Sequence, residues 1–504
     1  MNAIETHGLT KQYKDVTAVD GLELAVRQGE LFALLGVNGA GKTTTIKMLS
    51  CLTKPTAGDA LLLGRSAVRE PEAVKGLIAV SPQETAVAPK LTVEENLALM
   101  ARIADAGRQT PAGTGSACPQ TGNARPCKER VDALCDKLGL GEVRRKAAGK
   151  LSGGWQRRLS IAMALILEPK ILFLDEPTLG LDVLARAELW DLIRSLRGEM
   201  TVILTTHYME EAEALSDRIG VMGRGTAPDR GHGGGAQSRR RGSHLRGGLY
   251  PACKGGGKMK QTLLLSQRTA KEVLRDPLTL FFGLGFPLVV LGLLSAIQAN
   301  IPDAVSLFAP EKLVPGITVF GLSFMTLFSA LLVSRDRCSA LLLRLYTTPL
   351  RPAHYIFGYL LPMLPMALAQ TALCYAFGLV LGLPWRATIL AAIGLNLPAA
   401  LVFIALGLLC GSLLNDKQVG GVCGALLTNL SAWLSGIWFD VALVGGAFTA
   451  VAKVLPFWHA VELERAVYAG ALSDALPHLW VVLAWAAALT AAAVWAFLHQ
   501  MKKN

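Results

Sequence analysis

The spacing of apolar residues differs between the two halves of the chain. Up to about residue 223, short apolar runs alternate with polar stretches, as in an ordinary α/β domain. Leu31–Leu35 and Ile171–Leu174 are apolar runs of strand length, and Thr44–Leu49 has the composition of a helix that follows the first run. From about Leu278 onward, long apolar runs dominate, and they are too long to be strands. The pattern predicts an α/β domain followed by an all-α membrane domain.

Six of the long apolar runs are candidate membrane spans. A helix needs about 20 apolar residues to cross the hydrocarbon core of a bilayer. A charge at the bilayer centre costs about 2.5–3.5 kcal/mol on insertion scales, so the near absence of charge from these runs is informative. Buried helices of soluble proteins are rarely so long and so apolar, and we therefore predict a six-helix transmembrane domain. The runs are Leu278–Ile297, Val314–Val333, Ile356–Leu381, Ala387–Leu414, Val419–Phe439 and Leu479–Leu498.

Basic residues predict the orientation of these spans. Several Lys and Arg residues lie before the first run and between the second and third, Lys417 lies between the fourth and fifth, and Lys502 and Lys503 follow the sixth; the remaining segments together carry fewer. With six spans, the first four of these segments lie on one side of the membrane. By the positive-inside rule, both termini of a multi-pass protein of the cytoplasmic (inner) membrane are expected to be cytoplasmic.

Composition limits the choice of partners. The chain has 504 residues, 52% of them hydrophobic, and a formal net charge of +12. Nine Lys or Arg residues and one acid, Asp229, lie between Arg224 and Lys260, so most of the positive excess is in one linker and nucleic-acid binding is not expected. Nine cysteines are scattered without the spacing of a zinc site, and the polar stretch from Met1 to Ala25 lacks the apolar core of a signal peptide.

A glycine-rich loop follows the first strand. Gly36–Thr43 has the spacing G-x-x-x-x-G-K-[ST] of a phosphate-binding loop. Glycines allow a tight turn in which successive N–H groups face one anion. We expect Lys42 to reach the β- and γ-phosphates and the Thr43 hydroxyl to hold Mg²⁺, in front of a helix whose positive dipole end faces the phosphates. Because a strand and a helix flank the loop, we interpret it as a nucleotide site rather than a chance glycine-rich turn.

Two further motifs fit the chemistry of nucleotide hydrolysis. Ser152, Gly153 and Gly154 precede an apolar helix, where a serine cap and two glycines make a second nest for an anion. Asp175 and Glu176 end a buried strand. The first carboxylate fits a Mg²⁺ ligand, and the second fits a general base that activates water.

Three other residues are ambiguous when taken alone. Tyr13 lies upstream of the loop, where an exposed aromatic ring either stacks on adenine or is simply a residue at a strand edge. Gln83 follows a short apolar run, and a lone glutamine there is usually just solvated. His207 ends a strand, where a histidine is more often structural than catalytic.

In their order along the chain, these motifs resemble the nucleotide-binding domain of the ATP-binding cassette (ABC) superfamily, over about residues 3–223. The LSGG sequence between the phosphate loop and the paired carboxylates is highly specific. The matching elements are an aromatic A-loop (Tyr13), Walker A (Gly36–Thr43), a Q-loop (Gln83), the signature (Leu151–Gly154), Walker B with its glutamate (Asp175, Glu176), a D-loop (Asp182) and the switch histidine (His207).

This resemblance implies an ATPase with an α/β P-loop NTPase fold that uses ATP and Mg²⁺. It implies that Glu176, His207 and Lys42 are catalytic. It implies that Thr43, Gln83 and Asp175 hold the metal ion. The nucleotide is expected to contact Tyr13, Gly36, Val37, Asn38, Gly39, Ala40, Gly41, Lys42, Thr43, Thr44, Gln83, Ser152, Gly153 and Gly154.

Two positions depart from the pattern of the superfamily. Trp155 stands where the signature commonly has glutamine, and Leu179 stands where the D-loop commonly has serine. Neither change removes a group that contacts phosphate, so the departures concern the fine geometry of the dimer contact and not the ATPase assignment.

The second half resembles the type-2 permease domain of ABC exporters, over about residues 260–500. The stretch from Ser334 to Pro352 and the later SGIWF and LPFWHA sequences carry this resemblance. We expect Ser334–Leu345 to form a short amphipathic helix that docks on the ATP domain; the alternative is a basic helix that touches only lipid headgroups.

Polar residues and paired glycines within the predicted spans leave their roles open. Gln370, Asn396 and Asn429 either line a pathway or bond neighbouring helices. Gly407–Gly411 and Gly420–Gly424 have GxxxG spacing, a weak signal for close helix packing.

Together the two resemblances imply a half-transporter that exports a drug-like, lipid or polysaccharide substrate and hydrolyses ATP at two composite sites of a dimer. The expected partners are a second copy of the chain or a homologous half-transporter, the lipid bilayer, and a small-molecule, lipid or glycan substrate. One alternative is a membrane-bound ABC ATPase that regulates a partner without transport. A soluble cassette protein acting on ribosomes or DNA is a further alternative, and the six spans argue against it.

The expected domain boundaries are 1–223 for the nucleotide-binding domain, 224–258 for a linker and 259–504 for the permease domain. The linker is rich in Gly and Arg, cannot bury a core and is expected to be disordered. The superfamily usually has a Glu- and Leu-rich helical tail at this place. Codons for Gly231–Gln237, read one nucleotide later, are compatible with such a tail, and Met259 resembles a start. Two explanations of this segment therefore stay open. One is a frameshift that joined two reading frames, and the other is a flexible basic linker near anionic headgroups.

Overall fold

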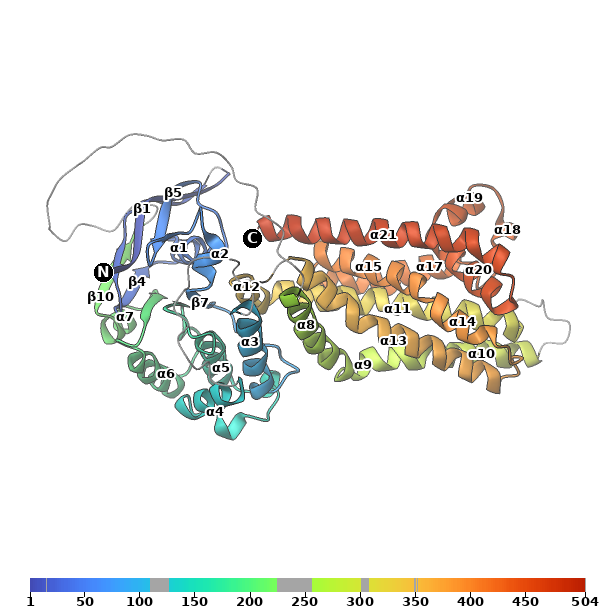
Figure 1. The fold of residues 1–504 in the computed structure, drawn as a ribbon, viewed down its shortest axis with the longest axis horizontal. Helices are drawn as coiled ribbons and strands as arrows, with labels where there is room; N and C mark the ends of the chain where they lie inside the picture. The colour runs from blue at the N-terminus through green and yellow to red at the C-terminus, as the bar shows by residue number, and fades with distance from the viewer. Residues whose placement is uncertain are drawn as a thin grey trace. The chain divides into compact units, whose positions relative to one another are not determined.

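The computed structural model describes residues 1–14, 16–108, 127–223, 256–300, 308–348, 350 and 352–503. The chain forms two compact units (Figure 1): Met1–Gln261 with Leu343–Pro349, and Thr262–Leu342 with Leu350–Asn504. Residues 224–255 of the predicted linker lie outside the described residues. Gly256 is already the first residue of helix α8 (Gly256–Leu274), so the last residues of the predicted linker are helical rather than disordered.

A parallel five-stranded sheet forms the centre of the first unit, in the order β10-β4-β9-β8-β7. Its inner strands are almost continuously apolar because both faces of the sheet are covered. All five strands run in the same direction, so the loops after their carboxyl ends meet at one edge of the sheet. The two strands expected around Leu31–Leu35 and Ile171–Leu174 are confirmed. The strands are β4 (Leu31–Gly36), β7 (Ile78–Ser81), β8 (Ile171–Asp175), β9 (Thr201–Thr206) and β10 (Arg218–Met222).

A second, antiparallel sheet shares a core with the first. Leu9 and Leu22 of this sheet belong to the same buried cluster as Leu34 and Phe173 of the parallel sheet. In Figure 1, β1 and β5 of this sheet lie at one end of the unit, and helices α4 and α6 lie at the other. Its strands are β1 (Asn2–Tyr13), β2 (Val16–Leu22), β3 (Ala25–Arg27), β5 (Ala57–Leu62) and β6 (Arg65–Ser66). The helices of the unit are α1 (Lys42–Leu49), α2 (Pro71–Lys75), α3 (Val93–Arg108), α4 (Cys127–Lys137), α5 (Gly153–Leu165), α6 (Val183–Ser195) and α7 (Met209–Leu215).

The second unit is an all-α bundle packed around α11 (Pro310–Cys338). In the described part of the chain, five helical segments are long and apolar enough to cross a membrane: Pro277–Asn300, Pro310–Arg337, Ala353–Val380, Thr388–Leu413 and Leu472–Gln500. They overlap five of the six predicted spans. The helices that form these segments are α9 (Pro277–Leu280), the π-helical η3 (Phe281–Gly285), α10 (Phe286–Asn300), α11, α13 (Pro352–Val380), α14 (Thr388–Leu395), α15 (Leu397–Leu413) and α21 (Leu472–Lys503).

The remaining predicted span, Val419–Phe439, is shorter than expected and is not one of these five segments. The chain from Asp416 to Trp438 nevertheless contacts both halves of α11: Ser334 Oγ donates to Asp416 Oδ1 at 3.0 Å, and the rings of Phe320 and Trp438 have centroids 5.6 Å apart. Fourteen residues of helix between these two contacts measure about 21 Å, so this segment runs antiparallel to much of α11 and the chain crosses the bundle a sixth time. Its helical pieces are α16 (Asp416–Val419), the π-helical η5 (Gly420–Leu427) and α17 (Thr428–Leu434).

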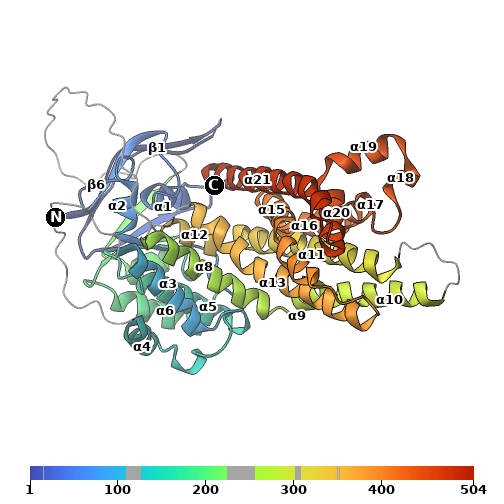
Figure 2. The same cartoon turned by 45° about the vertical axis from the view of Figure 1, so that its right-hand side comes forward.

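Three short helices follow this segment and precede α21. Within the second unit, α8 and the C-terminal end of α21 lie at one end of the bundle in both views, and the three short helices lie at the other (Figure 2). The three helices are α18 (Val441–Val444), α19 (Gly446–Val454) and α20 (Pro456–Ala469).

Polar residues inside the bundle bond neighbouring helices. The buried amide of Gln370 donates from Nε2 to the Thr318 carbonyl at 3.3 Å, and that of Asn396 donates from Nδ2 to Thr371 Oγ1 at 2.9 Å. Asn429 bonds only its own helix, through Nδ2 to the Ala425 carbonyl. The two buried amides therefore join helices, which is one of the two roles that the sequence left open.

The two glycine pairs behave differently. A Cβ at Gly407 would collide with Ser329 and with the Thr326 backbone of α11, and one at Gly411 would lie 2.5 Å from the Ala330 carbonyl oxygen. A Cβ at Gly420 would meet nothing within 4 Å. The first GxxxG pair therefore lets α15 approach α11 closely, as predicted, whereas the prediction of close packing is wrong for Gly420.

We expect Gly407→Ala to destabilise the membrane domain by about 1–3 kcal/mol, because the added methyl group has no space against α11. The matched control is Gly420→Ala, whose methyl group faces open space. Thermal unfolding of the two purified variants in the same detergent measures the difference. Equal melting temperatures for both variants would show that α15 and α11 are not packed as described.

Candidate active site

The loop between β4 and α1 has a backbone that requires glycine at defined positions. Gly39 and Gly41 have φ angles of 84° and 97°, in the left-handed region that favours glycine. A Cβ at Gly41 would also collide with the Ala18 carbonyl, and one at Gly36 would lie 2.8 Å from the Met222 carbonyl oxygen. The loop ends at Lys42, the first residue of α1, so it leads into the N-terminus of a helix. This is the local conformation that the sequence motif predicts.

Lys42 is buried at the base of this loop. Its Nζ donates to the carbonyl oxygens of Gly36 at 2.6 Å and Val37 at 3.2 Å, and it lies 3.4 Å from Glu176 Oε1. The ammonium group is thus held by the backbone of its own loop and by one carboxylate. Of the other loop residues, Val37, Asn38 and Gly39 are exposed, Ala40 is buried and Thr43 and Thr44 are half-buried.

Asp175 lies at the carboxyl end of β8, between two threonine hydroxyls. Thr205 Oγ1 on the neighbouring strand β9 donates to Asp175 Oδ1 at 2.5 Å, and Thr43 Oγ1 donates to the same oxygen at 3.2 Å. Burial raises the pKa of the Asp175 carboxyl above its usual range, and the hydrogen bonds from Thr205 and Thr43 oppose that rise. The sequence did not single out Thr205; only its place at the end of an adjacent parallel strand could have indicated it.

Three of the other candidate residues lie close to the carboxylate of Glu176. Its Oε1 lies 3.4 Å from Lys42 Nζ and 3.3 Å from His207 Nδ1, and Gln83 Nε2 donates to its Oε2 at 3.5 Å. Its backbone has φ 43°, a left-handed conformation that costs a residue other than glycine about 1–3 kcal/mol. Strained backbone of this kind is common where a side chain must be aimed at a reacting group. The loops after β4, β7, β8 and β9 therefore converge on one carboxylate.

The remaining predicted nucleotide contacts lie elsewhere in the first unit. Tyr13 ends β1 with its ring partly exposed, and Lys11 Nζ lies 5.0 Å from the ring centroid. Ser152 is the N-cap residue of α5, but its side chain makes no capping hydrogen bond. A Cβ at Gly154 would lie 3.0 Å from that of Ala185 on α6. None of the hydrogen bonds or ion pairs among the described residues joins Tyr13 or Ser152 to Lys42 or Glu176.

A buried acid links two segments beside the site. Glu211 on α7 accepts hydrogen bonds from Thr178 Oγ1 at 2.8 Å and from Thr206 Oγ1 at 2.5 Å. Thr206 precedes the candidate histidine His207, and Thr178 precedes the predicted D-loop. Sequence reasoning missed Glu211, because glutamates at helix starts are usually exposed.

Residues 343–349 belong to the first unit, although the chain reaches them from the membrane half. Arg344 of α12 (Ala340–Tyr346) is buried there: its guanidinium donates to the Ala86 carbonyl at 3.2 Å and to the carbonyl and hydroxyl oxygens of Ser160 at 2.6 and 2.7 Å. Burial, aided by the nearby positive charge of Arg157, lowers the pKa of the Arg344 guanidinium to about 9. Ala86 follows Gln83 by three residues and Ser160 lies on α5, so Arg344 makes the contact with the ATP domain that was expected of this segment. The single short helix predicted over Ser334–Leu345 is wrong, because Ser334–Cys338 continue α11 and α12 begins only at Ala340.

The SRDR stretch that precedes this segment joins four helices of the second unit. Asp336 pairs with Arg268 of α8 and accepts a hydrogen bond from the Tyr359 hydroxyl of α13 at 2.6 Å. Arg337 Nη1 donates to the Gly411 carbonyl of α15 at 2.8 Å. Arg335 Nε lies 3.5 Å from Asp416 of α16. Polar contacts therefore tie α11 to its neighbours immediately before the chain enters α12.

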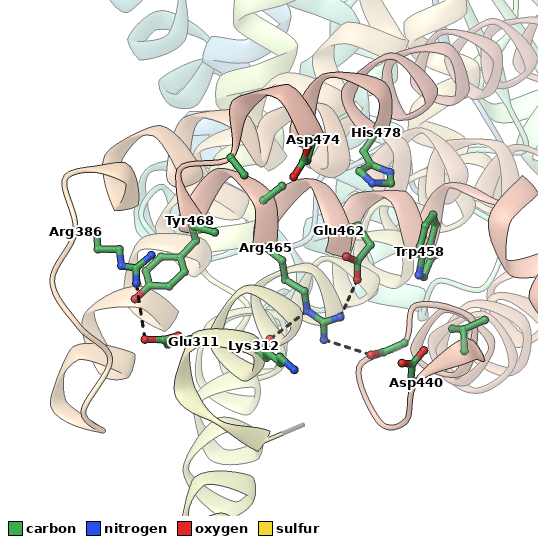
Figure 3. A pocket seen from close by; sticks show the side chains of 15 residues that line it. Glu311, Lys312, Arg386, Asp440, Trp458, Glu462, Arg465, Tyr468, Asp474 and His478 are labelled. Carbon is green, nitrogen blue, oxygen red and sulfur yellow. Dashed lines mark hydrogen bonds and ion pairs between the residues drawn. The ribbon is translucent and has the colours of Figure 1, made fainter. Parts of the chain in front are cut away.

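A polar pocket of about 620 Å³ lies at the opposite end of the second unit (Figure 3). Arg465 Nη1 donates to Glu462 at 2.8 Å and Nη2 donates to the Gly436 carbonyl at 3.2 Å, so this guanidinium joins α20 to the turn after α17. Arg386 lies 3.9 Å from Glu311 and stacks over the Tyr468 ring at 5.2 Å. The pocket contains charges of both signs.

Comparison with known proteins agrees with this geometry. Residues 19–179 match the family described as ABC transporter, and residues 260–468 match the family described as ABC-2 type transporter. The chain is a member of the ABC transporter family. It carries an ABC ATPase domain followed by an ABC-2 type membrane domain, and it is therefore a membrane protein.

Relatives of the ABC domain include proteins of known role. The daunorubicin/doxorubicin resistance ATP-binding protein DrrA of Streptomyces peucetius is 42% identical over 224 residues, which are 44% of this chain and 63% of that protein. The Nod factor export ATP-binding protein I of Ralstonia nicotianae is 39% identical over 223 residues, which are 44% of this chain and 64% of that protein. The chain thus spans a little under two thirds of the length of these relatives. A solved ATP-binding cassette in a dimeric post-hydrolysis state, bound to ADP and phosphate, is 24% identical with a TM-score of 0.38; the match covers 45% of this chain and 97% of that one.

For the ABC site we expect Thr205→Val to move the acidic limb of the ATPase pH profile to higher pH. The Thr205 hydroxyl lowers the pKa of Asp175, so its loss raises that pKa further and the carboxyl group takes up a proton at a higher pH. Thr201→Val is the matched control, because its hydroxyl, on the same strand, bonds the Gly29 amide and not Asp175. Hydrolysis rates measured across the pH range test this. A profile of Thr205→Val that overlies that of the control would contradict the role given to the hydroxyl.

Proposed function

We propose that this chain is a half-transporter that uses ATP hydrolysis to export a substrate across the cytoplasmic membrane. The observation that carries the proposal is the convergence of Lys42, Gln83 and His207 on the carboxylate of Glu176. The proposal also rests on Arg344, which is buried in the same unit and donates to the carbonyl of Ala86, three residues after Gln83. The loop from Gln83 to Ala86 thus contacts both the proposed general base and a residue from the membrane half of the sequence.

In the proposed reaction, Glu176 is the general base. It accepts a proton from the water that attacks the γ-phosphate, while Gln83 and His207 hold that water beside the carboxylate. Lys42 exchanges its two backbone carbonyl partners for phosphate oxygens when ATP enters the loop, and this exchange moves the ammonium toward the charge that develops on the transferred group. Tyr13 is assigned to stack on adenine, and Gly36–Thr44 are assigned to surround the phosphates.

The oxygen atoms at the end of β8 fit Mg²⁺. Among the described residues, no group of three or more His, Cys, Asp or Glu side chains could hold a metal ion. Mg²⁺ bound with a nucleotide does not need such a group, because phosphates and water supply most of its ligands. Thr43 and Asp175 meet through their side-chain oxygens, and Gln83 lies nearby at Glu176. Bound Mg²⁺ would polarise the phosphate oxygens as a Lewis acid.

We propose that the active form is a dimer with two composite sites. Among the described residues, no hydrogen bond joins Ser152, Gly153 or Gly154 to the phosphate loop of their own chain, and we assign them to close over the loop of a second copy. Exposed apolar side chains support this assembly, since burying them stabilises an interface. They include Val37, Leu179, Val183, Leu184 and Met209. A second copy of the chain is the simplest partner, and a homologous half-transporter is the runner-up.

The substrate class follows the names of the relatives, which refer to resistance to daunorubicin and doxorubicin and to export of Nod factor. We assign this chain a drug-like, lipid or polysaccharide substrate. Both termini are assigned to the cytoplasm, which is consistent with six crossings and with α8 and the end of α21 lying at the same end of the bundle. Residues 1–223 are assigned to the nucleotide-binding domain and 259–504 to the permease domain.

We expect Glu176→Gln to retain bound ATP but to hydrolyse it at least about 100-fold more slowly, because only the base is lost. Lys42→Ala should lose turnover through weaker contact with the phosphates. Glu72→Gln, an exposed acid of α2, is the control and should behave as the parent. The measurements are hydrolysis and retention of labelled ATP by purified protein. Parental turnover by Glu176→Gln would refute the assignment of the base.

Transport itself is tested with the purified wild-type protein in liposomes. Drugs, lipids and glycans that stimulate hydrolysis should also be moved across the bilayer by an exporter. Stimulated hydrolysis with no movement of any stimulating compound would instead favour a regulator of a partner.

We expect Arg344→Ala to keep ATP hydrolysis within about threefold of the parent and to lose most substrate transport, because its contacts reach Ala86 and Ser160 rather than the phosphates. Lys417→Ala removes an exposed positive charge from α16 and is the control for charge alone. The ratio of transported substrate to hydrolysed ATP measures the effect. An unchanged ratio for Arg344→Ala would contradict coupling through this residue.

A further inference from the structure

Arg157 makes five hydrogen bonds to the backbone of two loops. From its place on α5, its Nη1 donates to the carbonyls of Pro82 at 2.6 Å and Gln83 at 2.9 Å. Its Nη2 donates to the carbonyls of Asp175 at 2.8 Å and Glu176 at 2.9 Å, and its Nε donates to that of Pro177 at 2.7 Å. One planar group therefore holds the loop that carries Gln83 and the loop that carries Glu176.

The guanidinium is buried and charged, with no ion pair to a carboxylate among the described residues. Burial lowers its pKa to about 10, so it remains protonated at neutral pH. Charge-assisted hydrogen bonds are stronger than neutral ones, and here every donor nitrogen is used on a backbone carbonyl. These contacts fix main-chain positions, which a side-chain interaction between Gln83 and Glu176 alone could not do.

The backbone of Glu176 gives these bonds a function. Its left-handed conformation is held on one side by Thr205, whose carbonyl and hydroxyl oxygens both lie 3.1 Å from the Glu176 nitrogen. On the other side, Arg157 holds the carbonyls of residues 175 to 177. The direction in which the Glu176 side chain leaves the strand therefore depends on the guanidinium.

We propose that Arg157 is a positioning residue for ATP hydrolysis: it fixes the separation of the two loops so that Gln83 and Glu176 meet at the attacking water. This inference rests on the proposed ATPase reaction and adds a residue that touches neither nucleotide nor metal. Ser160, the residue that Arg344 contacts, lies one turn further along α5. A shift of α5 therefore moves both loops together.

The planar fork of arginine is needed for this arrangement, because a lysine ammonium is a single point donor and cannot reach five carbonyls in two directions. In Arg157→Lys we expect kcat for ATP hydrolysis to fall about tenfold or more, while KM and ATP affinity stay within about threefold. The matched control is Arg130→Lys. Arg130 is a similarly buried arginine of the same unit, bound to Asp105 and the Ala101 carbonyl and not to either loop.

A double-mutant cycle separates positioning from general damage. If Arg157 acts through Glu176, adding Arg157→Lys to Glu176→Gln should change the residual rate less than about twofold. Equal losses in the parental and the Glu176→Gln backgrounds would overturn the proposal, as would a parental kcat in Arg157→Lys. If Arg157→Lys does not fold, judged by its melting temperature against Arg130→Lys, Arg157→Gln is taken through the same cycle with the same two criteria.

The wild-type rate keeps the two proposals apart. Wild-type protein without ATPase activity would overturn the proposed function itself. If the wild-type protein is active, a parental kcat in Arg157→Lys, or equal losses in the parental and Glu176→Gln backgrounds, would overturn only the role of Arg157.

Discussion

Glu176 keeps a left-handed backbone at the end of β8, and the arrangement of the whole site depends on the contacts that hold it there. Thr205 bonds its amide from the neighbouring strand, and the Arg157 guanidinium bonds the carbonyls that follow. With the backbone fixed, the carboxylate lies within 3.3 to 3.5 Å of groups from three other loops. Parallel strands make this possible because their carboxyl ends lie at one edge, so loops distant in sequence meet there.

In the membrane domain, the helices must associate without a hydrophobic effect between them, so close packing and polar contacts hold them together. Small residues let α15 approach α11, where Gly407 and Gly411 leave room for the partner backbone. Charged side chains join helices at the ends of the bundle: Asp336 joins α8, α11 and α13 at one end, and Arg465 joins α20 to a turn at the other.

Local patterns were sufficient to predict much of this molecule. The phosphate loop, the strand ends at Asp175 and His207, and five of the long spans follow from spacing and apolar length, which depend on neighbours in sequence. The contacts of Arg157 were missed because their partners lie far away in sequence, and Glu211 was missed because glutamates at helix starts are usually exposed. Arg157 stands between Gln156 and Arg158, so its neighbours in sequence did not indicate that it is the buried one. The π-helical stretch in Gly420–Leu427 was also missed, because a count of apolar residues carries no information about hydrogen-bond register.

The central claim is that two copies of this chain build each ATP site together. Lys42→Ala and Gly153→Asp should each inactivate a homodimer, the first through the phosphate loop and the second through the signature. Co-expressed with different tags and purified through both, the two variants form dimers that contain one site with both parts intact. The account predicts that these mixed dimers hydrolyse ATP at about half of the wild-type rate. Mixed dimers as inactive as either parent variant would contradict it.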